Sequence, residues 1–237
     1  MKTILVTGAT SGIGKAFALY AARSGYCVIA CGRNPQVLAE LSAENNINTL
    51  QFDVTNTDQT NQALSSVAFD IAVLNAGTCE YVDLPVFEPA MFRRVFDVNF
   101  FGIVNCIHAL LPQCQRGHQL VIIDSMARLL PFTRSEAYGA SKAAVHYLSQ
   151  SLSVDLKDKG IIVQSVSPGF VETPLTDKND FEMPMKITAS EAAVTLLKCI
   201  EARQQAIYFP TVFGLILRTL SHLPQRVKRW IASKLQQ

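Results

Sequence analysis

The sequence predicts an α/β protein whose single domain is built on a doubly wound, mostly parallel sheet. Short runs rich in Val, Ile and Leu alternate with amphipathic stretches along most of the chain. Such runs, without polar alternation, are typical of strands buried on both faces of a parallel sheet. Of the 237 residues, 49% are hydrophobic and only 17% are charged, which favours a large core. The first apolar run leads directly into a glycine-rich turn and a helical stretch.

The candidate elements follow one another in strand–helix order. The strands are expected at residues 3–6, 27–31, 49–52, 70–74, 120–123 and 161–166. The helices are expected at residues 13–24, 35–45, 58–66, 91–111, 136–159 and 190–202, the last entered through a capping box of Thr188 and Glu191. Right-handed crossovers between such units build a doubly wound sheet. We expect one domain over residues 1–209, with a substrate loop at 173–187 and a separate tail at 210–237.

Composition excludes several classes of protein. A net charge of +2 argues against nucleic acid as the main partner. No apolar run reaches the roughly 18 residues of a membrane span, and the apolar start is too short for a signal peptide. The six cysteines form no Cys-x-x-Cys pair and the four histidines are scattered, so we expect a reducing compartment and no metal site. The expected location is the cytoplasm.

A glycine cluster joins the first strand to the first helix. Gly8, Ser11, Gly12, Ile13 and Gly14 form a Gly-x-x-x-Gly-x-Gly turn. Glycines allow the backbone to approach a pyrophosphate closely, and the helix N-terminus offers free N–H groups to that anion. Glycine is common in turns of every kind, but its place between strand and helix favours dinucleotide binding.

The end of the second strand indicates which dinucleotide is bound. An NAD site expects Asp or Glu about 20 residues after the glycines, but no acid lies between Lys15 and Ala39. Arg33 is placed instead to pair with a 2′-phosphate. Asn34 or Ser11 can donate further hydrogen bonds to that phosphate. The alternative is that Arg33 is a solvated loop residue. We expect NADP(H).

Further motifs complete a recognisable set. After the glycine turn, five further motifs follow in order: Asn75-Ala76-Gly77, Asn99, Ser125, the run from Tyr138 to Lys142, and Pro168-Gly169. Together they resemble the short-chain dehydrogenase/reductase family over residues 1–209. The resemblance implies a seven-stranded Rossmann sheet, a nicotinamide cofactor and hydride transfer to or from a carbonyl or alcohol carbon.

The resemblance also implies roles for individual residues. Ser125 would bind the substrate oxygen, Lys142 would hold the nicotinamide ribose, and Asn99 would anchor a water for proton relay. Cofactor contacts would come from residues after strands three, four and six: Asp53 and Val54 at the adenine; Asn75, Ala76 and Gly77 at the adenosine ribose; Pro168, Gly169, Val171 and Thr173 at the nicotinamide carboxamide.

Tyr138 and Lys142 have a chemistry that follows from their spacing. Four residues apart on a helix, they share one face. A free tyrosine has a pKa near 10, and a nearby ammonium beside an oxidised nicotinamide is expected to lower it toward the range that general acid–base catalysis needs. Tyr138 alone would be interpreted as a core tyrosine; its pairing with Lys142 and Ser125 favours a catalytic role.

The tail is basic and amphipathic. No Asp or Glu occurs after Glu201, whereas basic residues stand at 203, 218, 226, 228, 229 and 234. Apolar residues recur at helical spacing from Phe213 to Leu223 and again from Val227 to Leu235. The segment 212–237 is expected either to contact a membrane surface or to pack on the substrate site or a partner subunit.

These observations predict an enzyme. The expected reaction is hydride transfer between NADP(H) and a carbonyl or alcohol carbon of a small apolar molecule, with lipid-like or acyl compounds as candidates and Tyr138 as general acid/base. We expect a homodimer or homotetramer, cytoplasmic or peripheral at the inner face of a membrane. The alternative is an NADP(H)-binding sensor or scaffold without turnover, which has no need for Asn99, Ser125, Tyr138 and Lys142 together.

Overall fold

The computed structural model describes residues 1–177, 179 and 182–234. Its centre is a sheet of seven parallel strands in the order β3-β2-β1-β4-β5-β6-β9. The strands are β1 (Thr3–Thr7), β2 (Cys27–Gly32), β3 (Ile47–Gln51), β4 (Ile71–Leu74), β5 (Gln119–Ile123), β6 (Ile162–Pro168) and β9 (Ala206–Phe209). The strand order reverses between β1 and β4, which makes their carboxyl ends the switch point of a doubly wound sheet. The predicted fold class is confirmed.

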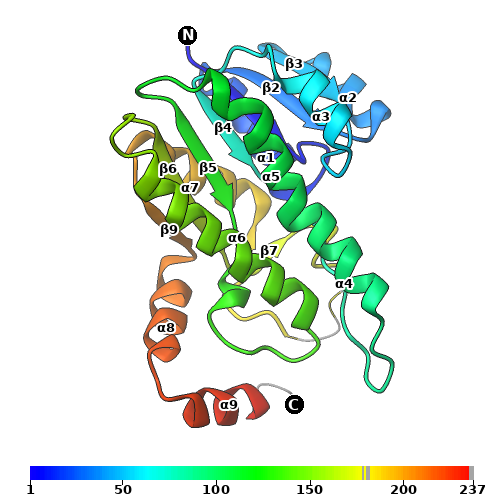
Figure 1. Ribbon diagram of the computed structural model, residues 1–237, viewed down its shortest axis with the longest axis vertical. Helices are drawn as coiled ribbons and strands as arrows, with labels where there is room; N and C mark the ends of the chain where they lie inside the picture. Colours follow the sequence, from blue (N-terminus) through cyan, green and yellow to red (C-terminus); the bar gives the residue numbers. More distant parts are fainter. Residues whose placement is uncertain (178, 180–181, 235–237) are drawn as a thin grey trace.

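Helices cover both faces of the sheet (Figure 1). On one face lie α1 (Gly12–Arg23), α2 (Pro35–Ser42) and α7 (Ala189–Glu201); on the other lie α3 (Thr57–Leu64), α5 (Gly102–Leu110) and α6 (Glu136–Asp155). Successive strand residues point to opposite faces, so Ile4 and Val6 join the first core cluster whereas Leu5 joins the second. The central strands β1, β4 and β5 are thus buried on both faces, which is why they are apolar runs, whereas the edge strand β3 keeps Asn48 and Gln51 exposed.

Several element boundaries differ from the sequence prediction. The helix expected at 91–111 starts at Pro89 and consists of α4 (Pro89–Phe96), the π turn η1 (Asp97–Phe101), α5 and the 3₁₀ turn η2 (Leu111–Gln113). The strand expected at 49–52 is β3, which starts at Ile47. α6 ends at Asp155 instead of residue 159, because the chain turns there and Gly160 adopts a φ of +70°. α2 and α3 also end before residues 45 and 66.

Two short strands lie outside the main sheet. β7 (Val171–Glu172) pairs in parallel with β8 (Ile187–Thr188). The pair holds together the two ends of the loop expected at 173–187. Residues 178, 180 and 181 of that loop lie outside the described residues.

The tail forms two helices at the end of the molecule away from the N-terminus (Figure 1). These are α8 (Thr211–Ser221) and α9 (Gln225–Lys234). On the inner side of α8, Phe213 and Leu217 are buried against Met126 and Leu130. The stripe predicted for this helix is therefore only partly covered by the protein, because Ile216 is 43% exposed.

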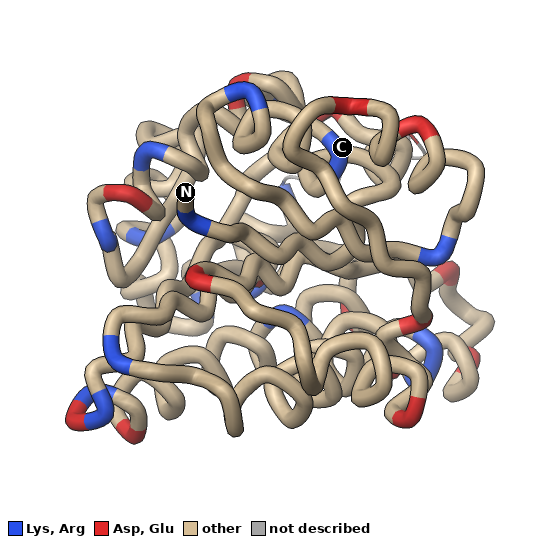
Figure 2. Tube along the Cα trace, turned by 90° about the horizontal axis from the view of Figure 1, so that it is seen from above, with Lys and Arg blue, Asp and Glu red and all other residues tan. Residues whose placement is uncertain are grey.

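Charges of both signs are interspersed over the molecule seen from above (Figure 2). One helical stretch, Pro89–Gln113, is long and apolar enough to cross a membrane, but it contains α5, whose residues Ile103, Cys106 and Leu110 belong to the core. This stretch is typical of a core helix in a Rossmann-type fold.

Candidate active site

A cleft lies at the carboxyl ends of the strands, where ligands bind to doubly wound sheets. Its cavity measures about 230 Å³. Ser125, Tyr138 and Lys142 line it. So do most of the residues that the sequence assigned to cofactor binding: Gly8, Ser11, Gly12, Ile13, Arg33, Asp53, Val54, Asn75, Ala76, Gly77, Pro168, Gly169, Val171 and Thr173.

The glycine turn forms one wall of this cleft. Gly12 has a φ of +51°, in the left-handed region that favours glycine. A Cβ on Gly14 would lie 2.3 Å from Gly8 O, so Gly14 permits close packing of helix on strand and does not itself line the cleft. Ser11 is the N-cap of α1, yet its side chain makes no cap hydrogen bond. The turn therefore presents a free hydroxyl and a helix N-terminus, which together suit an anion.

Two adjacent strands are tied together at the switch point. Thr7 Oγ1 accepts hydrogen bonds from the backbone N–H groups of Asn75 at 3.0 Å and Ala76 at 3.1 Å. Asn75 Nδ2 donates back to Thr7 O at 3.1 Å. The side chain of Asn75 is thus engaged by β1, and the sequence motif at 75–77 fixes the floor of the cleft.

The residues predicted to choose between NAD and NADP lie at the rim. Arg33 Nη1 is 3.2 Å from Asp53 Oδ2, and the arginine side chain is 69% exposed. Burial raises the pKa of Asp53, but hydrogen bonds from Thr55 and Arg33 outweigh it and lower that pKa below its ordinary value. Asn34 does not line the cleft; its Oδ1 accepts from the N–H groups of Gln36 and Val37 and caps α2.

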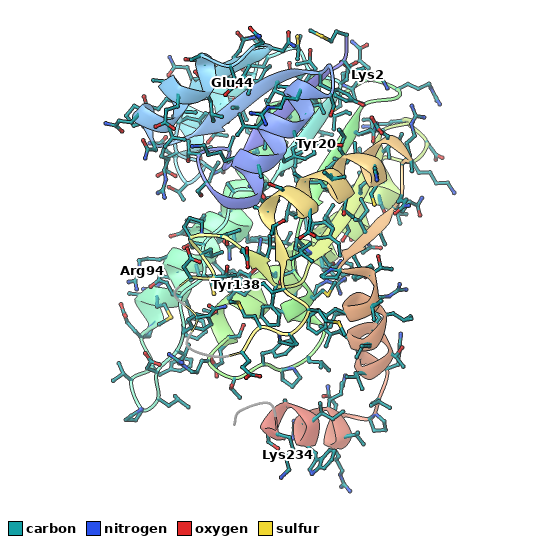
Figure 3. All side chains as sticks on the ribbon, turned by 180° about the vertical axis from the view of Figure 1, so that it is seen from behind. Lys2, Tyr20, Glu44, Arg94, Tyr138 and Lys234 are labelled. Atoms are coloured by element: carbon teal, nitrogen blue, oxygen red, sulfur yellow. The ribbon has the colours of Figure 1, made fainter. Side chains whose placement is uncertain are left out.

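A stripe of α6 faces the end of β5. Tyr138, Lys142 and His146 are spaced four residues apart and meet three consecutive residues, Ile123, Asp124 and Ser125. The side chain of Ser125 hydrogen-bonds Tyr138. Lys142 Nζ donates to Ile123 O at 3.0 Å and lies 5.9 Å from the centre of the Tyr138 ring. His146 Nδ1 is 2.8 Å from Asp124 Oδ2. Figure 3 shows Tyr138 between the sheet and the tail helices.

Asn99 lies behind this stripe, in the π turn η1, and does not line the cleft. It is fully buried. Its Nδ2 donates to Thr78 O and to Ser141 Oγ, both at 2.9 Å, and its Oδ1 accepts from Thr78 N at 2.7 Å. The π turn thus directs an asparagine against the segment after β4, and π turns often occur at functional sites.

Burial controls the protonation of the two residues on α6. It raises the pKa of Tyr138 above its ordinary value; the hydrogen bond from Ser125 lowers that pKa by less than burial raises it. Burial also lowers the pKa of Lys142 to about 8, although the negative charge of Asp124 opposes this effect. The protein's own environment therefore keeps Tyr138 protonated, whereas the sequence argument expected Lys142 and a bound nicotinamide to favour the phenolate.

Asp124 is a buried residue that the sequence analysis did not assign to the site. Its carboxylate is inaccessible to solvent; Oδ2 accepts from Ser165 Oγ at 2.8 Å and lies 3.4 Å from Arg128 Nε, in addition to the contact with His146. Asp124 also lines the cleft. The only sequence signal was its position next to Ser125. Thr10, Thr78 and Thr176 are further cleft residues that no motif indicated.

A second cavity, of about 360 Å³, adjoins the cleft. The two share Ser125, Tyr138, Pro168, Gly169, Leu175 and Thr176. The walls of the second cavity are largely apolar and include Met126, Phe132, Phe170, Phe213, Leu217 and Ala232. Tyr81 Oη hydrogen-bonds Asn179 Oδ1 beside it. Tyr138 thus lies where the cleft meets a largely apolar cavity.

A glycine turn at the switch point of a doubly wound sheet, beside a Ser–Tyr–Lys group, is characteristic of nucleotide-binding oxidoreductases. The model of the family described as short chain dehydrogenase matches residues 2–183. The chain therefore belongs to the short-chain dehydrogenase family, as the sequence resemblance indicated, and it is an oxidoreductase of that type. Within the described residues, no group of three or more His, Cys, Asp or Glu could hold a metal ion.

Individual relatives agree with this assignment. An uncharacterized oxidoreductase of Myxococcus xanthus is 33% identical over 236 residues, covering 94% of this chain and 93% of its own. Serine 3-dehydrogenase of Agrobacterium fabrum is 35% identical over 184 residues, 73% of this chain and 74% of its own. A solved short-chain dehydrogenase from Sphingobium yanoikuyae, in complex with NADPH, superposes with a TM-score of 0.81 at 25% identity, covering 95% and 97% of the two chains.

Proposed function

We propose that this protein is an NADP(H)-dependent carbonyl reductase or alcohol dehydrogenase acting on a small apolar substrate. The observation that carries the proposal is the position of Tyr138 and Ser125 on the wall shared by the nucleotide cleft and the apolar cavity. A carbonyl or alcohol group held there faces both the proton-carrying side chain and the cleft. A bound nicotinamide would supply or accept the hydride.

Tyr138 is the proposed general acid/base. Its pKa is raised by burial, so the phenol carries its proton at neutral pH and is prepared to donate it to a carbonyl oxygen. Ser125, hydrogen-bonded to Tyr138, would donate to the same oxygen and fix its position. Lys142, held by Ile123 O, brings a cation within 5.9 Å of the ring centre and would bind the nicotinamide ribose. That charge stabilises the phenolate left after proton transfer.

Asn99 supports the proposed site from behind. A Cβ placed on Gly77 would lie 3.3 Å from Asn99 Oδ1 and 3.4 Å from Lys142 Nζ, so both polar groups converge on Gly77. Their position around a residue without a side chain is compatible with the water relay that the sequence resemblance implied for Asn99.

NADP(H) is the proposed cofactor because of Arg33. The guanidinium is exposed at the rim beyond the end of β2 and available to a 2′-phosphate. Asp53 pairs with it, so a phosphate would compete with this carboxylate for the guanidinium. The remaining proposed cofactor contacts are the residues of the sequence prediction that line the cleft, with Ser11 and the α1 N-terminus at the pyrophosphate.

The apolar walls of the second cavity favour an apolar substrate. Aromatic and aliphatic side chains from η3 (Met126–Arg128), from the segment after β6 and from α8 surround it. Lipid-like and acyl compounds would bury their chains against these apolar walls, while polar lining residues such as Thr133, Ser135 and Asn179 remain available to a polar end of the substrate. The sequence-based suggestion of a substrate-site cover fits α8, whose Phe213 and Leu217 form part of the wall.

Self-association is part of the proposal. Tyr147 and Val154 on α6 are 76% and 72% exposed, and Phe101, the last residue of the π turn η1, is 51% exposed. Large apolar side chains on one helical layer favour burial in a homodimer or homotetramer. Light scattering in solution tests this, and a monomer at micromolar concentration would contradict it. We place the enzyme in the cytoplasm, where six free cysteines stay reduced.

The experiment that tests the proposed reaction is a screen of NADPH consumption over ketones, aldehydes and 3-oxoacyl thioesters. We expect turnover of apolar carbonyl compounds, and a weaker response with NADH. The sensor or scaffold alternative predicts nucleotide binding by calorimetry with no turnover of any carbonyl or, in the reverse direction, alcohol.

A further inference from the structure

The outer sides of the two tail helices are apolar and exposed. On α8, Val212, Leu215 and Ile216 face away from the core, and Leu215 is 64% exposed. On α9, Val227 and Trp230 are exposed, the tryptophan by 63%. Exposed apolar side chains on two consecutive helices indicate that these helices bind something outside the protein. We call these five residues the outer tail surface.

The tail that carries this surface is basic and has no acidic residues. Arg226, Arg229 and Lys234 are exposed on α9, and residues 202–237 contain no Asp or Glu at all. In the view from above, the two signs of charge are mixed over the molecule (Figure 2). A partner of the outer tail surface must therefore satisfy both apolar and cationic groups.

We propose that the outer tail surface docks on an anionic lipid bilayer. Short helices with a basic face, an apolar face and a tryptophan insert their apolar side chains at the headgroup level, while Lys and Arg bind anionic lipids. A second copy that met this surface through the same surface would place cations against cations, which disfavours a two-fold dimer here.

The inner sides of the same helices form part of the wall of the apolar cavity. Phe213, Leu217 and Ala232 line the apolar cavity, whereas Leu215 and Trp230 lie on the opposite sides of α8 and α9. Two short helices thus separate the cavity from the docking surface. This part of the inference rests on the proposed function: an apolar substrate dissolved in the bilayer reaches the cavity past α8 and α9 without crossing water.

Co-sedimentation of the full-length protein with vesicles tests the docking. Vesicles of equal parts phosphatidylglycerol and phosphatidylcholine should pellet the protein at low salt, and phosphatidylcholine alone should not. High salt should release it, because it screens the basic side chains. The double substitution Arg226→Gln and Arg229→Gln should weaken the partition coefficient about 30-fold, at a factor of about five per cation.

Apolar variants and matched controls complete the design. Leu215→Ser with Trp230→Ser should abolish pelleting, since each substitution removes an exposed apolar side chain that would insert into the bilayer. Val86→Ser, an exposed apolar residue elsewhere (70% exposed), and Arg23→Gln, a cation on α1, should leave pelleting unchanged. NADPH consumption with a water-soluble ketone should be equal in all these variants, because none of the residues lines the cleft or the cavity.

The outcomes separate the docking from the proposed reaction. Absence of pelleting with anionic vesicles in low salt overturns the docking, whatever the activity. A change of assembly mass in the Leu215/Trp230 variant, without vesicle binding, also overturns it and assigns the surface to a second copy. Vesicle binding by a protein without turnover upholds the docking and contradicts the proposed function instead.

Discussion

His146 Nδ1 lies 2.8 Å from Asp124 Oδ2, and this contact sets a register between α6 and the end of β5. One helical turn before His146, Lys142 binds Ile123 O, and one turn before that Tyr138 meets Ser125. Three consecutive residues at the end of β5, Ile123, Asp124 and Ser125, thus each hold one residue of a helical stripe. Ser165 on β6 and Arg128 add further contacts to Asp124, so the carboxylate locks two strands and the helix together.

Asp124→Asn is expected to move the alkaline limb of the pH–rate profile to lower pH. Burial lowers the pKa of Lys142 to about 8, and the Asp124 carboxylate opposes this because it attracts the ammonium. Removing that negative charge therefore lowers the pKa further, and Lys142 loses its proton at a lower pH. The kcat/KM for carbonyl reduction, measured from pH 6 to 10, reports this limb.

Ser165→Ala is the matched control for Asp124→Asn. It removes one hydrogen bond to the carboxylate but leaves its charge. We expect an unchanged alkaline limb there. A uniform loss of activity at every pH in Asp124→Asn would indicate a purely structural role and contradict the electrostatic one.

Tyr138→Phe is expected to reduce kcat by about 10²–10⁴-fold. The ring still packs on the cavity wall, but the proton donor is lost, so NADPH affinity by fluorescence titration should stay near that of the wild type. A kcat above about a tenth of the wild-type value would contradict the assignment of Tyr138 as acid/base. A tenfold loss of rate corresponds to roughly 1.4 kcal/mol in activation free energy.

Arg33→Asp is expected to reverse the preference for NADPH over NADH. The change removes the cation at the rim and adds repulsion toward a 2′-phosphate, while the new carboxylate accepts from a free 2′-hydroxyl. Calorimetric titration of both nucleotides measures the ratio of their Kd values. Equal affinities of the wild type for the two nucleotides would refute the NADP(H) assignment.

Asp53→Asn tests the Arg33–Asp53 ion pair at the rim of the cleft by changing the acidic partner. It frees Arg33 from its ion-pair partner, 3.2 Å away, and the new amide keeps a hydrogen-bonding group at the position proposed to meet the adenine, so NADPH should bind the variant at least as tightly as the wild type. Weaker NADPH binding would show that the nucleotide needs the negative charge of Asp53.

Phe213→Ala is expected to destabilise the protein by about 3 kcal/mol. Phe213 is only 9% exposed, and its ring packs on that of Phe170, with the ring centres 5.7 Å apart. For a chain of this size the melting temperature should fall by about 6–12 °C. Leu215→Ala, on the exposed side of the same helix, should change the unfolding free energy by less than about 0.5 kcal/mol. Equal melting temperatures for the two variants would contradict the packing role of Phe213.

The sequence by itself determined six of the seven strands of the main sheet, the glycine turn and the Ser–Tyr–Lys group, whereas the strand β9 (Ala206–Phe209) was not predicted. These features depend on local patterns: apolar runs form buried strands, glycines 12 and 14 permit a turn against β1, and Tyr138 and Lys142 share a helix face through their spacing of four. Asn34, by contrast, is an N-cap and not part of the cleft wall, because its local hydrogen bonds to α2 engage its side chain.

Only the tertiary structure decided how distant residues combine. No sequence motif marks the buried polar group of Asp124, Arg128, His146 and Ser165. These residues interact because β5, β6 and α6 pack side by side. The pKa of Tyr138 is raised by burial, which spacing along a helix does not reveal. The division of α8 into a side that lines the cavity and a side that faces solvent likewise depends on where the chain places this helix after β9. Contacts between residues far apart in the sequence, and the water they exclude, leave no periodic signal in the sequence.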